Sequence, residues 1–310
     1  MYKIFFFFSL FAVASMGCGQ HCHVSPAGHE GIAVKPDTLL KSEKINATIG
    51  EGLLLTQYES LGQLKSVVRI TYMKDSSGVC LSSRCRDHEV TNELKTGLGQ
   101  ADFERAKNGN FLNQLWLGLR CPFAVFHKRS LASIGNLGRR KFGVHGDVAF
   151  YDLAETMVQH ISDEDRVNLS EKDLSEKGYL NTFEHIITSA LMTSMYSQSV
   201  AEFVGDAHER SSMPELMTGK FTPEQLADVD DGPVDNYLDI INNEWGQELG
   251  KVLRQKYNIN QDTRWTPQLL ADYLNDIESY HSWVFRIAFR PYTPEEEIVV
   301  RFAKKMNTGI

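Results

Sequence analysis

The side chains best suited to catalysis or metal binding gather between residues 181 and 250 of this 310-residue chain. They are imidazoles, carboxylates and amides: His185, His208, Glu209, Asp239, Asn242 and Asn243. Imidazole nitrogens and carboxylate oxygens are ligands that zinc and other divalent ions accept. The same groups, when buried without an ion, form hydrogen-bond networks that satisfy one another. The sequence therefore leaves two interpretations, a metal site or a structural network.

In the first interpretation, zinc or another divalent ion has three protein ligands, which are His185, His208 and Asp239. Glu209 would be the general base of a metal-assisted hydrolase, and Asn242 or Asn243 would donate to an oxyanion or orient the substrate. In the second interpretation, the chain is a non-catalytic binding or scaffolding protein. Two histidines on one helix in the pattern His-Glu-x-x-His would name a reaction class, and this spacing does not.

Apolar residues at helical spacing predict the elements that position these groups, at residues 180–196, 199–210 and 234–257. The few residues around Ser197 have the length of an antiparallel helical hairpin. His185 lies 12 residues before Ser197 and His208 lies 11 after it. At ~1.5 Å per residue, both imidazoles return to roughly 17–18 Å from the turn. We therefore expect the two rings to meet.

Two glycines lie inside the third predicted helix, on the same stripe as Asp239. Gly246 and Gly250 each cost about 0.5–1 kcal/mol relative to alanine in a helix interior. Such positions usually allow another segment to approach closely. We expect a tight helix contact here, next to the polar groups.

The same stretch resembles a known family. The order Phe183-x-His185, Ala207-His208-Glu209 and Asp239-x-x-Asn242-Asn243-x-x-Gly246 is similar to an uncharacterised all-α domain of bacterial secreted and toxin-like proteins. Members commonly have an arginine where this chain has Glu184. The resemblance is confined to residues 181–250. It implies a shared site on helices and names no reaction.

The N-terminus has the profile of a secretory signal peptide at residues 1–17. Lys3 precedes an apolar run that reaches Ala14 and is too short to span a bilayer comfortably. The run ends in Ala14-Ser15-Met16-Gly17-Cys18, which resembles the lipobox of bacterial lipoproteins. The resemblance implies lipidation of Cys18 and anchoring to a membrane of the bacterial cell envelope. Ordinary cleavage, followed by secretion, is the alternative.

The other four cysteines predict disulfides, because exported proteins meet an oxidising compartment. They are Cys22, Cys80, Cys85 and Cys121. Three pairings are possible for four thiols. Cys80 and Cys85 are close enough in sequence to close a small loop, which would join Cys22 to Cys121.

We expect a mainly α protein, in which a small disulfide-bearing α+β region precedes a helical C-terminal domain. The predicted divisions are a tether at 18–51, the α+β region at 52–151 and the helical domain at 152–310. The strand candidates are Ser66–Tyr72, Phe123–Phe126 and Val148–Tyr151, and residues 101–118 have a helical pattern. That helix would bury four apolar side chains, Phe103, Leu112, Leu115 and Trp116.

The net charge of the chain limits the kinds of partner that it can bind. The formal net charge is −8, which argues against non-specific nucleic-acid binding. The expected membrane contact is the N-terminal lipid anchor, because no second apolar run is long enough to span a bilayer. The sequence thus predicts an exported envelope protein with either a metal-assisted hydrolase site or a structural polar network.

Overall fold

The computed structural model describes residues 57–72, 78–85, 88–95, 97–141, 144–213, 222–224 and 233–308. The chain is mainly helical, as the sequence predicted. The expected signal peptide at 1–17 and tether at 18–51 lie outside the described residues, and so do Cys18 and Cys22.

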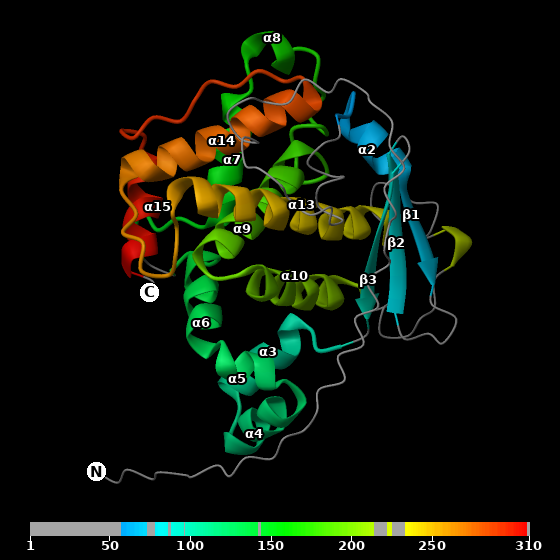
Figure 1. The fold of residues 1–310 in the computed structure, drawn as a ribbon, viewed down its shortest axis with the longest axis vertical. Coiled ribbons are helices and arrows are strands. Elements are labelled where there is room, and N and C mark those ends of the chain that lie inside the picture. The colour runs from blue at the N-terminus through cyan, green and yellow to red at the C-terminus, as the bar shows by residue number, and fades with distance from the viewer. Residues whose placement is uncertain are drawn as a thin grey trace. The chain divides into compact units, whose positions relative to one another are not determined.

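Three helices form the centre of the fold: α9 (Tyr179–Met195), α10 (Gln198–Ser212) and α13 (Pro233–Tyr257). They confirm the helices predicted around the polar groups. Ser197 separates α9 from α10, and its hydroxyl accepts from the Val200 backbone N–H at 3.2 Å, which caps α10. α9 packs against α13 and α7, and α10 packs against both α9 and α13 (Figure 1).

The two glycines of α13 allow its close approach to α9. A Cβ atom added at Gly246 would lie 2.5 Å from the Ile186 carbonyl oxygen, and one added at Gly250 would lie 2.5 Å from the Ala190 carbonyl oxygen. Both neighbours are backbone atoms, so the contact has no room for a larger side chain. The expected tight helix contact is confirmed.

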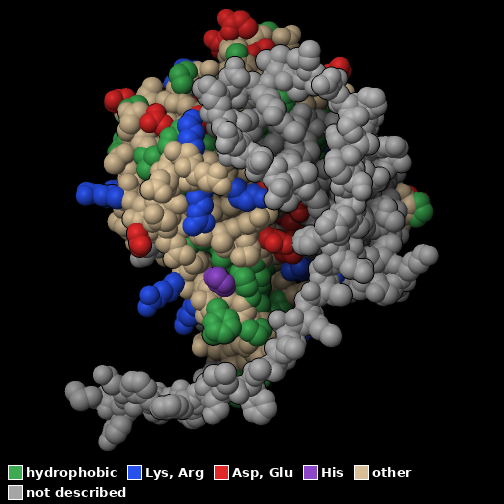
Figure 2. All heavy atoms as spheres, in the orientation of Figure 1, with side chains coloured by type: hydrophobic (Ala, Val, Ile, Leu, Met, Phe, Trp, Pro, Cys, Tyr) green, Lys and Arg blue, Asp and Glu red, His purple; other side chains and the backbone are tan. Residues whose placement is uncertain are grey.

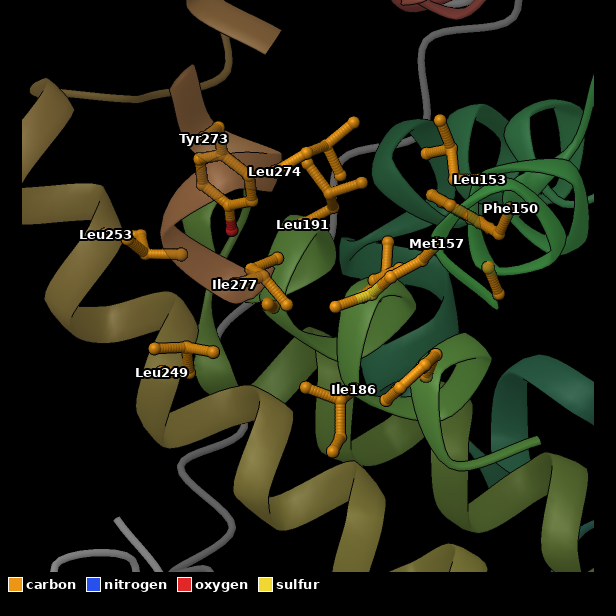
Figure 3. Close-up of a cluster of buried hydrophobic side chains, with 14 of the residues drawn as sticks. Phe150, Leu153, Met157, Ile186, Leu191, Leu249, Leu253, Tyr273, Leu274 and Ile277 are labelled. Atoms are coloured by element: carbon orange, nitrogen blue, oxygen red, sulfur yellow. The ribbon is translucent and has the colours of Figure 1, made fainter. Parts of the chain in front are cut away.

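Further helices enclose the apolar core: α7 (Phe150–His160), α14 (Pro267–Phe285) and α15 (Glu297–Thr308). Thr266 caps α14 by accepting from the Leu269 backbone N–H at 3.1 Å. The short α8 (Asp163–Arg166) follows α7. Figure 3 shows core side chains from α7, α9, α13 and α14 pointing toward one another, among them Met157, Ile186, Leu249 and Ile277.

Residues 61–95 contain one helix and a small antiparallel sheet: α2 (Leu61–Val67), β1 (Val68–Tyr72), β2 (Gly78–Cys85) and β3 (His88–Lys95). The strand order is β1-β2-β3, with Val68 opposite Ser83 and Gly78 opposite Lys95. β1 covers Val68–Tyr72 of the strand predicted at Ser66–Tyr72, whereas Ser66 and Val67 belong to α2.

The predicted Cys80–Cys85 disulfide does not fit this architecture. Cys80 and Cys85 lie on one strand, β2, five positions apart. An extended strand separates their Cα atoms by ~16 Å, whereas a disulfide needs about 4.4–6.8 Å. A Cys80–Cys85 bridge is therefore wrong, because the expected small loop is a strand. Cys121 is a half-buried free thiol in the structure. Its predicted partner, Cys22, lies outside the described residues, so that pairing stays a prediction.

Residues 100–137 form four short helices: α3 (Gln100–Asn108), α4 (Phe111–Arg120), α5 (Pro122–Phe126) and α6 (Lys128–Leu137). The helix predicted at 101–118 is divided because Asn110 starts a new helix and accepts from the Asn113 backbone N–H at 3.1 Å. The strands predicted at 123–126 and 148–151 are wrong. Pro122 occupies the first turn of α5, and α7 begins at Phe150.

Two further predictions for this region fail. Leu112, Leu115 and Trp116 were expected in the core, yet they are 67%, 48% and 45% exposed. The domain division expected after residue 151 falls inside α7, and described residues on both sides of that point belong to one apolar core.

Candidate metal centre

His185 lies at the centre of a polar cluster between α9, α10 and α13. Its Nδ1 atom is 3.1 Å from Asn243 Oδ1 and 3.7 Å from Glu209 Oε1. Its Nε2 atom, on the other side of the ring, is 3.6 Å from Asp239 Oδ2. The hairpin at Ser197 brings Glu209 to this place, and the α9–α13 contact brings the other two residues.

Asn243 fixes the orientation of this cluster. Its Oδ1 accepts from Ser189 Oγ at 2.8 Å, and its Nδ2 donates to Glu209 Oε1 at 3.0 Å. Because Oδ1 only accepts, His185 must donate to it from Nδ1–H. In the neutral imidazole, Nε2 then carries the lone pair and faces Asp239. This nitrogen is available to a metal ion.

A hydrogen bond from α9 holds the Asp239 carboxyl group in position. Its Oδ1 accepts from Asn181 Nδ2 at 2.6 Å, which leaves Oδ2 toward His185. One turn earlier on α13, Asp235 pairs with Lys65 Nζ at 2.7 Å. That lysine lowers the pKa of Asp239, although burial has the larger, opposite effect.

The charged forms of the two carboxyl groups in this cluster are unfavourable, because both groups are buried and lie close together. Burial raises the pKa of Glu209 well above its ordinary value, and the charge of Asp239 raises it further. Burial and Asp235 likewise raise the pKa of Asp239. Burial lowers the pKa of His185, so the ring stays neutral. A neutral imidazole beside two carboxyl groups with raised pKa values is a set whose protons a divalent cation would displace on binding.

The spacing of the three ligand groups is suited to one ion. One ligand atom each from His185, Glu209 and Asp239 lies within 4.8 Å of the other two. A tetrahedral ion with bonds of ~2.0–2.2 Å separates its ligands by roughly 3.3–3.6 Å. The 3.6 Å between His185 Nε2 and Asp239 Oδ2 is too long for a hydrogen bond and close to that edge length, whereas Glu209 faces Nδ1 of the same ring at 3.7 Å.

A small acidic cleft between α10 and α13 adjoins the cluster. Besides Glu209 and Asn243, it is lined by Glu202, Gly205, Asp206, Ile240, Glu244 and Gln247. Burial raises the pKa of Asp206 to about 6 and that of Glu244 to about 8. Neighbouring carboxylates add to both shifts. The cleft thus offers proton donors and acceptors that titrate near neutrality.

Two of the predicted site residues, His208 and Asn242, lie outside the ligand group. The His208 ring lies beside His185, with centroids 6.3 Å apart, so the helical hairpin aligns the imidazoles as expected. His208 is exposed, however, and its Nδ1–H donates to Gln100 Oε1 at 3.1 Å, outside the three-residue ligand group. Asn242 is fully buried and is turned by about 100° from Asn243 around α13. Its amide has no hydrogen-bond partner among the described residues.

Sequence reasoning identified Asn243 but missed two other polar residues of this network, Asn181 and Ser189. Asn181, His185 and Ser189 occur at four-residue intervals on α9, which places them on one face. Asp239 and Asn243 have the same interval on α13 and meet that face. The shared four-residue period in two helices was the signal that could have identified this network.

Comparison of the chain with protein-family models, curated proteins and solved structures gives no match. Within the described parts of the chain, none of the helices combines the length and apolarity that crossing a membrane requires.

Proposed function

We propose that this protein binds one divalent metal ion at His185, Glu209 and Asp239 and acts as a metal-assisted hydrolase. The observation that supports the proposal most strongly is the convergence of one nitrogen and two carboxylate ligand atoms within 4.8 Å. Zinc accepts this ligand set, and its catalytic sites commonly have three protein ligands with a position left for water or substrate. A divalent ion held here would supply Lewis acidity to a carbonyl or phosphoryl oxygen.

The protein's own groups have distinct roles in this proposal. Asn243 and Asn181 orient the ligands through the hydrogen bonds described above. Glu209, first expected as the general base, is better placed as a ligand. Asp206, with a pKa of about 6, is suited to accept a proton, and Glu244, with a pKa of about 8, is suited to donate one to a leaving group.

A second candidate function is non-catalytic envelope binding or scaffolding, with the cluster as a polar network. It is favoured by the completeness of the hydrogen bonds around Asn243, which joins His185, Ser189 and Glu209 without an ion. Such a network would fix the register of α9, α10 and α13.

Metal analysis of the purified full chain separates the two candidates. We expect one ion per chain after dialysis against zinc and then metal-free buffer, and loss of that ion in His185→Ala with the helical circular dichroism retained. His145→Ala replaces an exposed histidine elsewhere and serves as the matched control. Loss of helicity in His185→Ala, together with a metal-free wild type, would support the network instead.

Hydrolysis is tested with the zinc-loaded chain against ester and phosphoester substrates. Activity should disappear in Asp239→Asn and fall in Glu244→Gln, because the second variant keeps the ligands and removes a proton donor. Zinc binding without hydrolysis of any substrate class would leave a metal-binding protein and refute the enzymatic part of the proposal.

The cellular location is also a proposal. The lipobox-like sequence ending at Cys18 supports export and lipid anchoring to the bacterial cell envelope, with secretion as the alternative. The resemblance of residues 181–250 to domains of secreted proteins agrees with export. Expression in a bacterial host tests the anchor, because Cys18→Ala should move the chain from the membrane fraction to the soluble fraction.

A further inference from the structure

Residues 105–146 differ sharply in charge from the rest of the chain. They contain eight lysines and arginines and neither aspartate nor glutamate, although the chain as a whole has a formal net charge of −8. The run covers α4, α5 and α6. Arg105 and Arg140 pair with Asp102 and Asp152 outside this run, and the remaining basic groups favour a negatively charged partner.

The same segment exposes apolar side chains that a helix normally buries. On α4 they recur at one-turn intervals and form a single stripe: Leu112, Leu115, Trp116 and Leu119. Leu119 is 76% exposed, and Phe126 at the end of α5 is 84% exposed. These five side chains, with the exposed Val125, define the α4–α5 surface. Figure 2 shows hydrophobic side chains gathered in the region where Figure 1 draws α4 and α5.

Basic groups border this apolar surface. The Arg120 guanidinium lies 4.6 Å from the centroid of the Trp116 ring. Lys128 and Arg129 follow Phe126 by two and three residues, and both are exposed. An exposed tryptophan, leucines and a phenylalanine beside arginine and lysine is the composition of helices that lie in the interface of an anionic membrane.

We propose that the α4–α5 surface docks on an anionic lipid bilayer. Such a bilayer meets both features at once, since its interior takes up the leucine and phenylalanine side chains and its headgroups pair with the basic ones. Docking there does not depend on the metal centre.

Tryptophan fluorescence gives a local readout of this contact in the full chain. Of the four tryptophans, Trp245 and Trp265 are buried and Trp283 is half-buried, whereas Trp116 lies on the docking surface. Brominated acyl chains quench tryptophans that enter a bilayer. We expect brominated vesicles of phosphatidylcholine with phosphatidylglycerol to quench the wild type and to leave Trp116→Phe unquenched.

Two further variants separate charge from apolar insertion. Lys128→Glu combined with Arg129→Glu should weaken vesicle binding at least about tenfold and make it insensitive to salt. Leu112→Ser combined with Phe126→Ser should abolish quenching at all lipid concentrations. Val167→Ser, which changes an apolar side chain that is 82% exposed outside this surface, should behave as the wild type.

Several outcomes would overturn the proposal. Equal quenching in Trp116→Phe would place the membrane contact elsewhere, for instance at the N-terminal apolar run. Equal quenching without phosphatidylglycerol would remove the role of the basic groups. Absence of quenching, together with a dimer in light scattering that Leu112→Ser dissociates, would assign the surface to a second copy of the chain.

Discussion

Replacing Gly246 by alanine tests the helix contact that assembles the metal centre. In an isolated helix, this change would stabilise the structure by about 0.5–1 kcal/mol. Here the new Cβ would lie 2.5 Å from the Ile186 carbonyl oxygen and 2.8 Å from Ser189 Cβ. Overpacking of this kind costs ~1–3 kcal/mol, and a backbone neighbour favours the upper end. We therefore expect a net loss of about 2 kcal/mol in the free energy of unfolding.

Gly135→Ala is the matched control, because Gly135 also lies inside a helix, α6. The nearest atom to its added Cβ is Arg139 Nη2 at 3.6 Å, which is ordinary contact with a flexible side chain. This variant should gain about 0.5–1 kcal/mol. The two glycine-to-alanine variants should thus differ by roughly 3 kcal/mol, with opposite signs.

Urea unfolding followed by circular dichroism measures both free energies, and unchanged m values would show that the comparison is valid. Gly246→Ala should also weaken zinc binding, since the displacement of α9 moves His185 away from Asp239. A Gly246→Ala variant as stable as Gly135→Ala would refute the tight contact and the account of how these ligands meet.

Three other predictions follow from the site. In metal-free protein, the free energy of unfolding should fall as the pH rises from about 4.5 to 8. Burial raises the pKa of Glu244 to about 8, so the folded state binds more protons than the unfolded state over this range. Glu244→Gln should remove on the order of 2 kcal/mol of that fall, measured by urea unfolding at each pH, and an unchanged pH profile would contradict it. Asn181→Ala should weaken zinc affinity by about 10–100-fold in a chelator competition, because Asp239 loses its orienting hydrogen bond; unchanged affinity would refute this role. Cys121 should react with iodoacetamide without prior reduction, and a Cys22–Cys121 cross-linked peptide in mass spectrometry would contradict the free thiol.

The helices of the site could be predicted because their signals are local. The apolar period of α9, α10 and α13, the cap at Ser197 and the glycines of α13 all lie in short stretches of sequence. The hairpin then follows from the loop length alone, and with it the meeting of His185 and His208.

The predictions that failed concern features that depend on tertiary contacts. The apolar stripe of α4 has the pattern of a core helix, and nothing in that pattern tells which way the stripe faces. Cys80 and Cys85 looked like a small loop because strand pairing with β1 and β3 is not visible locally. The choice between Asn242 and Asn243 likewise depends on the rotation of α13 against α9, which their adjacent positions leave open.

Calorimetric titration of zinc into the chelator-treated full chain, in two buffers of different ionisation enthalpy, tests the central claim most directly. We expect one ion per chain, with net proton release that diminishes as the pH rises, because Glu209 and Asp239 give up protons to the metal. We also expect Asp239→Asn to abolish this binding. Binding heat that is identical in wild type and Asp239→Asn, or no binding in the wild type, would contradict the metal centre.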